Sequence, residues 1–207
     1  LGELLLYIFL EQVLVAPKLM SKVEIGNHGG LMTSESSGIH LLTANETVPF
    51  SQVILGTSMI KGDLQTAIDS AFADAQKLKN RKKDERRFVE SNIFAVSFPT
   101  KIYDQLEAII LPSETNGQKP ATAFGMFVGY SLSGVSANGK PVNEYQNDVL
   151  EQVRNDIQNN VPFIEAKITQ YGFDGYSMYI YLLPFADADE DKKDIMDKLL
   201  QSGGGQA

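Results

Sequence analysis

The sequence predicts a mixed α/β (α+β) fold, in which helices flank a mixed β-sheet. A helical pattern opens the chain, two segments rich in apolar and β-branched residues follow it, and helices then alternate with strands. Of the 207 residues, 43% are hydrophobic and 21% charged, which predicts a globular chain. We expect a single domain over residues 1–201 and a flexible tail over residues 202–207. Because the chain begins with Leu1 and not Met, it is expected to be part of a longer protein or a processed chain.

The first half is predicted to contain a helix, a hairpin and a second helix. Apolar residues at helical spacing run up to Pro17, which ends or kinks a helix. Asn45 and Glu46 form a turn between two apolar segments, which predicts a β-hairpin. The expected elements are a helix over residues 2–16, strands over 38–43 and 51–56, and a helix over 62–79.

The second half is predicted to alternate helices with strands. Tyr179 and Tyr181 alternate with Met178, Ile180 and Leu182, as in a strand with two different faces. Val149, Val153 and Ile157 follow helical spacing and are expected to point inward. The expected elements are helices over residues 99–111, 141–159 and 187–200, and strands over 123–132 and 177–183.

Composition excludes several classes of protein. The chain has no Cys, so disulfide scaffolds, thiolate catalysis and Cys-ligated metal sites are excluded. Its apolar start lacks basic residues and contains Glu3 and Glu11, which argues against a signal peptide. No apolar run is long enough to span a membrane. We therefore expect no membrane partner and a cytoplasmic location.

One basic stretch stands out in a chain of net charge −8. Its seven cations and two acids give it net +5, so the rest of the chain carries −13. The stretch is either a DNA-binding patch that contacts phosphates or a solvated helix end, where cations also favour the helix dipole. The seven candidate DNA-binding residues are Lys77, Lys79, Arg81, Lys82, Lys83, Arg86 and Arg87.

Other motifs are weak. His28 and His40, the only histidines, form either a metal-ligand pair or, as is more common near a glycine-rich turn, structural residues. No nucleophile elbow, phosphate-binding loop or dinucleotide fingerprint is present. A Glu-x-Lys occurs at Glu165 and Lys167, with Asp156 nine residues earlier. It is interpreted either as a catalytic pair or as the solvated face of a strand.

Four segments carry a resemblance to a known family. They resemble the C-terminal domain of HamA, the nuclease-fold subunit of the Hachiman antiphage defence system, which works with the helicase HamB. The most specific segment is Ala-Pro-Lys-Leu-x-Ser-Lys, and the motif block covers about residues 2–75. The segments are Gly2-Glu-Leu-Leu-Leu-Tyr-Ile-Phe-Leu-Glu11, Ala16-Pro-Lys-Leu-Met-Ser-Lys22, Ser37-Gly-Ile-His-Leu-Leu42 and Leu55-Gly-Thr-Ser-Met59.

The resemblance implies a restriction-endonuclease-like fold with a degenerate catalytic site. Active members of the family resemble PD-(D/E)xK nucleases, with a helix Glu, then Asp-Gly-x-His, then Gly-Glu-x-Lys. Glu3 matches the helix Glu, and Gly38 and His40 match the Gly and His. Ser37, Thr57 and Met59 replace the Asp, Glu and Lys. Because neutral hydroxyls are weak ligands of Mg²⁺ and Met supplies no cation, most of the catalytic machinery is expected to be lost.

Three functions stay open at this point. The first is an inactive or weakened HamA-like subunit that acts on DNA with a HamB-like helicase and needs no cofactor. The second is an active nuclease that binds Mg²⁺ through Glu3 together with Glu24, Glu35 or Glu46 as relocated acids. The third is an interaction or scaffold domain outside defence.

Overall fold

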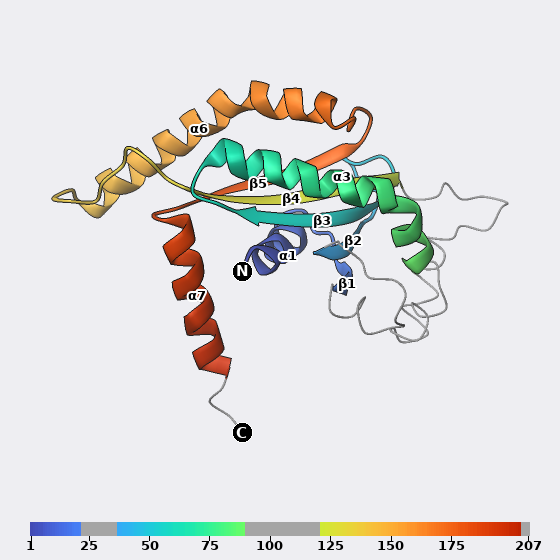
Figure 1. Ribbon diagram of the computed structural model, residues 1–207, viewed down its shortest axis with the longest axis horizontal. Coiled ribbons are helices and arrows are strands. Elements are labelled where there is room, and N and C mark those ends of the chain that lie inside the picture. Colours follow the sequence, from blue (N-terminus) through green and yellow to red (C-terminus); the bar gives the residue numbers. More distant parts are fainter. Residues whose placement is uncertain (22–36, 90–120, 204–207) are drawn as a thin grey trace.

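A computed structural model describes residues 1–21, 37–89 and 121–203 of the chain (Figure 1). The helix predicted over residues 99–111 and two of the candidate acids, Glu24 and Glu35, lie outside these residues. The elements, in chain order, are α1 (Gly2–Gln12), β1 (Lys18–Ser21), β2 (Gly38–Leu42), β3 (Gln52–Ile60), α3 (Leu64–Val89), β4 (Ala121–Ser131), α6 (Val142–Gln170), β5 (Ser177–Phe185) and α7 (Ala188–Gly203).

The five strands form one mixed sheet in the order β1-β2-β3-β4-β5. β1, β2 and β3 are antiparallel neighbours, whereas β3, β4 and β5 run parallel to one another. Helix α6 connects the parallel strands β4 and β5. The prediction of a mixed sheet flanked by helices is confirmed, and the arrangement is restriction-endonuclease-like.

Two hydrophobic layers cover the two faces of this sheet. Helices α3 and α6 lie on one face and α1 on the other, while α7 projects from the body of the molecule (Figure 1). On the α3 face, Phe72 and Phe124 are buried in the first core. On the α1 face, Leu6 and Leu10 pack with Phe127 in the second. The predicted alternation in β5 is confirmed, because Met178, Ile180 and Leu182 contact the first core, and Tyr179 and Tyr181 contact the second.

Glycines allow α1 to lie close to β3. A Cβ atom built on Gly56 would be 2.9 Å from Leu6 Cδ2 and 3.1 Å from the Gly38 carbonyl oxygen. One built on Gly2 would be 3.0 Å from the Ser58 hydroxyl. Such distances leave no room for a side chain, so the glycines of the early motifs serve the packing of α1 on the sheet.

Several boundaries differ from the prediction. Helix α1 ends at Gln12 rather than residue 16, because Val15 adopts a left-handed conformation with φ 57° ahead of Pro17. Helix α3 continues past residue 79 to Val89. β3 continues to Ile60 and therefore contains both Thr57 and Met59.

Helix α6 departs most from the prediction. It runs through Pro162 to Gln170, so Glu165 and Lys167 lie on a helix and the predicted strand face is wrong. Ile157, predicted to point inward, is 39% exposed, whereas Asn160 is only 9% exposed. Apolar residues mark the buried side of α6 near its C-terminal end, where Phe163, Ile164 and Ile168 pack against the first core, but not at Ile157 and Asn160.

Candidate functional site

Three of the four positions assigned by the resemblance lie on or beside β2 and β3. Ser37 precedes β2, and its backbone N–H donates to the Gly56 carbonyl oxygen of β3 at 2.7 Å. Thr57 is 5% exposed. Met59 packs against the first core, on the α3 face of the sheet. By strand alternation Thr57 shares that face, because side chains two residues apart point the same way.

Glu3 lies on the other side of the sheet. It is an exposed residue in the first turn of α1, which packs on the opposite face from Met59. The fold thus brings Ser37, Thr57 and Met59 near one another and places Glu3 on a helix across the sheet. Within the described ranges, no three His, Asp or Glu side chains group closely enough to hold a metal ion.

His40 has a structural environment. It is 2% exposed, and its Nδ1 lies 2.9 Å from the Ala16 carbonyl oxygen. The Tyr7 ring lies beside it, with ring centroids 6.1 Å apart. Burial lowers the pKa of His40, against the opposing effect of this hydrogen bond. His40 therefore links β2 to the chain that follows α1, while its predicted partner His28 lies outside the described residues.

The seven basic candidates all lie on α3, and the structure describes the side chains of the first two. Lys77 forms an ion pair with Asp74 at 2.7 Å. Lys79 donates to the carbonyl oxygens of Tyr171 and, at 3.0 Å, Gly172, and lies over the ring of Phe173. Because Tyr171 is the C-cap of α6, the Lys79 cation stabilises the negative end of that helix.

The Glu-x-Lys segment joins α6 to α3. Lys167 forms an ion pair with Asp69 of α3 and is only 14% exposed. This contact holds the pKa of the Asp69 carboxyl below its usual value, and the Tyr171 hydroxyl adds a hydrogen bond at 3.3 Å. Lys167 also lies over the Phe163 ring. Glu165 is exposed on the same helix, so the described contacts of this segment are those of helix packing.

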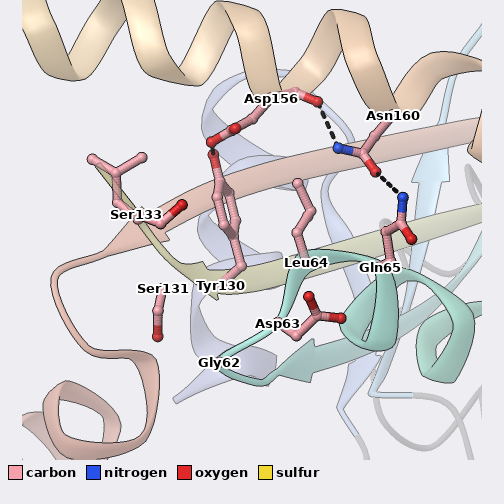
Figure 2. Close-up of a pocket in the computed structure, with 10 residues that line it drawn as sticks. Gly62, Asp63, Leu64, Gln65, Tyr130, Ser131, Ser133, Asp156 and Asn160 are labelled. Carbon is pink, nitrogen blue, oxygen red and sulfur yellow. Dashed lines mark hydrogen bonds between the residues drawn. The ribbon is translucent and has the colours of Figure 1, made fainter. Parts of the chain in front are cut away.

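A cavity of about 490 Å³ opens where β3 and β4 end (Figure 2). In open sheets, ligands bind beyond the carboxyl ends of parallel strands, which is where this cavity lies. It is lined by Gly62, Asp63, Leu64, Gln65, Tyr130, Ser131, Leu132, Ser133, Asp156 and Asn160.

A network of hydrogen bonds joins three elements across this cavity. The Tyr130 hydroxyl donates to Asp156 Oδ2 at 3.0 Å, and Gln152 Nε2 donates to Asp156 Oδ1 at 2.8 Å. Asn160 Nδ2 donates to the Asp156 carbonyl oxygen, and Gln65 Nε2 donates to Asn160 Oδ1 (Figure 2). Burial and the contact with Asp156 raise the pKa of Tyr130, so its hydroxyl stays a donor at neutral pH.

Asp63 supplies a second carboxylate to the cavity. Its Oδ1 accepts a hydrogen bond from the Thr66 N–H at 2.7 Å and so caps α3. The hydroxyl and N–H of Thr66 lower the pKa of Asp63. No Lys, Arg or His is among the described residues that line the cavity. The described lining of the cavity therefore carries two carboxylates and no cationic side chain.

Sequence analysis identified only one residue of this cavity, Asp156, and connected it with the Glu-x-Lys segment. An Asp directly before the helical pattern at Leu64 is the usual signal of an N-cap and marks Asp63. Nothing in the helical period marks Asn160, because it occupies the buried side where apolar residues are expected.

A family model named HamA matches residues 1–199 of the 207. No curated protein and no solved structure gives a significant match. Among the described elements, no helix is both long enough and apolar enough to cross a membrane. The match covers nearly the whole chain and agrees with the motif segments of α1, β2 and β3. The chain therefore belongs to the HamA family and is a protein of Hachiman antiphage defence.

Proposed function

We propose that the chain is a cytoplasmic HamA-type subunit that acts on DNA with a HamB-like helicase and whose own nuclease site is inactive or weakened. The observation that carries this proposal is the residue type and burial at two positions of β3. Thr57 stands where an active member has its metal-binding Glu, and it is 5% exposed. Met59 stands in the Lys position and is partly buried against the first core.

Magnesium chemistry explains why these replacements matter. Mg²⁺ prefers carboxylate and water oxygens in octahedral geometry, and it rarely gives up its water for a neutral hydroxyl. The thioether of Met59 is a soft group with no positive charge, so it neither binds Mg²⁺ nor stabilises a phosphorane-like charge. With Ser37 also neutral, Glu3 is the one carboxylate that the family pattern retains.

A cleavage assay tests nuclease status. Purified chain, with and without the partner helicase, is incubated with plasmid and linear DNA in Mg²⁺ or Mn²⁺. We expect no cleavage above that of a Glu3→Ala variant. Metal-dependent cleavage that is lost in Glu3→Ala but kept in the matched surface variant Glu190→Ala would contradict the proposal. It would favour the active nuclease with relocated acids, of which Glu46 is exposed in the hairpin turn.

The helicase partner is supported by family membership and charge. Outside the basic stretch the chain carries net −13, which complements a basic partner surface. Co-expression of the chain with the neighbouring helicase should give a complex that co-purifies at low salt. Separate elution of the two proteins at low salt would count against the partner. Membership in the HamA family favours this role over a scaffold outside defence.

Contact with DNA is proposed for the second half of α3. Replacing Lys82, Lys83 and Arg86 by Ala should weaken DNA binding by the complex and reduce the salt slope by about 0.9 for each phosphate that is no longer neutralised. A matched variant replaces Lys192, Lys193 and Lys198 of α7 by Ala and should leave the slope unchanged. If both triple variants show the same salt slope of DNA binding, the basic stretch is a solvated helix end and not a DNA contact.

A further inference from the structure

The cavity beyond β3 and β4 is independent of the proposed nuclease positions. Thr57 and Met59 lie within β3, whereas the cavity starts past its end, at Gly62. Its wall comes from the loop before α3, the end of β4, and α6 (Figure 2). A volume of about 490 Å³ lies within the range of small-ligand sites in proteins.

Helix α6 presents polar side chains to this cavity. It turns Asp156 and Asn160 to the inside, while Leu150, Ile157 and Val161 are 53%, 39% and 43% exposed. A helix selected for packing alone buries its apolar side chains and exposes its amides. Phe163, Ile164 and Ile168 of the same helix pack against the first core, so the inward polar side chains of α6 are those around Asp156 and Asn160, at the cavity.

The Asp156 carboxylate is the main acceptor of the hydrogen-bond network. The hydroxyl of Tyr130 and the side-chain amides of Gln152, Asn160 and Gln65 all donate within the protein. Each oxygen of the Asp156 carboxylate accepts one of these hydrogen bonds, and a carboxylate offers about four acceptor positions. A ligand that brings N–H or O–H donors can therefore bind the remaining acceptor positions of Asp156.

The charged residues that line the cavity favour a ligand that is positively charged and donates hydrogen bonds. Asp63 and Asp156 both line the cavity, and no Lys, Arg or His joins them among the described lining residues. A Cβ atom built on Gly62 would lie 3.9 Å from Asp189 Oδ2, so the start of α7 adds another acid near the rim. We propose that this cavity binds an organic cation, through an ammonium or guanidinium group that donates hydrogen bonds to Asp156 and Asp63.

Other ligand classes fit less well. Phosphate and carboxylate ligands meet two carboxylates and no cation on the described wall. A metal ion finds no group of three His, Asp or Glu side chains among the described residues. A guanidinium group, by contrast, presents five N–H donors in a plane, and an ammonium group presents three. Two sources share this chemistry, a free polyamine and a basic side chain of another protein.

Three probes separate charge and source. Spermidine represents the free polyamine, and Nα-acetyl-arginine amide represents a basic side chain. Nα-acetyl-citrulline amide has nearly the same shape without the positive charge. Binding is followed on the full chain by titration calorimetry and by shifts of the side-chain amide signals of Gln65 and Asn160 in ¹⁵N-labelled protein.

We expect saturable binding of spermidine or of the arginine probe, with both amide signals shifting. The citrulline probe and the Asp156→Asn variant should each weaken binding by about tenfold or more, because a charge-assisted hydrogen bond is removed. Ser133→Tyr, which adds bulk to the cavity wall without removing a charge, should weaken binding as well. Asp197→Asn removes the same charge from an exposed part of α7 and should leave binding unchanged.

The preferred probe identifies the source of the cation. Absence of saturable binding by both cations would overturn the proposal. Equal binding of the citrulline probe, or equal weakening by Asp197→Asn and Asp156→Asn, would also overturn it, because binding would then owe nothing to the cavity carboxylates. DNA cleavage and helicase binding are separate measurements, so failure here leaves the proposed function untouched.

Discussion

The middle of β3 and the region beyond its C-terminal end differ in where their polar side chains lie. In the middle, Thr57 is buried and Met59 is partly buried against the first core, so the strand contributes chiefly to packing. Past the end, Asp63 faces an open cavity together with Tyr130 and Asp156. The positions that the resemblance assigns to a nuclease site thus lie in packed sheet structure, whereas two carboxylates line the cavity beyond the strand end.

The largest expected effect comes from restoring a carboxylate in the middle of β3. Thr57→Glu should lower the free energy of unfolding by about 3–5 kcal/mol at pH 7, because an ionised group would be buried without a partner. Thr57→Gln has the same size without the charge and should cost less. Urea unfolding of both variants measures the difference. A Thr57→Glu variant that is as stable as Thr57→Gln and is further stabilised by Mg²⁺ would show a usable metal position.

A smaller effect is expected where α1 lies on β3. Gly56→Ala places a Cβ atom 2.9 Å from Leu6 and 3.1 Å from the Gly38 carbonyl oxygen, and should cost about 1–3 kcal/mol of stability. Gly62→Ala, at the open end, meets its nearest atom at 3.7 Å and should change stability by less than about 0.5 kcal/mol. Equal unfolding midpoints for the two variants would contradict the close packing of α1.

The pH dependence of stability tests His40. Burial lowers the pKa of His40 in the folded state, so the unfolded chain binds its proton first as the pH falls. The stability that this residue contributes is therefore present above about pH 6.5 and is lost below it, by at most about 1.4 kcal/mol per pH unit. Unfolding in urea between pH 5 and 7.5 should show this slope, and His40→Gln should flatten it. An unchanged slope in the variant would assign it to other groups.

The smallest effect concerns the contact between α6 and α3. Lys167→Met keeps most of the apolar stem and removes the ion pair with the half-exposed Asp69, so the cost should be about 0.5–1 kcal/mol. Glu165→Gln, on an exposed part of the same segment, should change stability by less than about 0.3 kcal/mol. If the unmodified chain does cleave DNA, loss of that cleavage in Glu165→Gln with stability unchanged would instead indicate a catalytic role.

Much of the fold was predictable because the spacing of apolar residues along a helix or strand follows the side that is buried. The strands predicted over residues 123–132 and 177–183 match β4 and β5 closely, because their alternating side chains face the two buried layers. Helix α6 was harder, because Pro162 suggests an end and Asn160 takes a buried place. The cavity was largely missed, since its residues come from segments far apart in the chain and meet only through the pairing of β3 with β4.

Binding of manganese tests the loss of the nuclease site most directly. Mn²⁺ replaces Mg²⁺ at carboxylate sites and broadens nearby NMR signals, so a ¹⁵N-labelled chain titrated with Mn²⁺ reports where the ion is held. We predict no selective broadening of the amide signals of Ser37, Thr57 and Met59. Selective broadening of these three signals together with that of Glu3, reversed by excess Mg²⁺, would contradict the account.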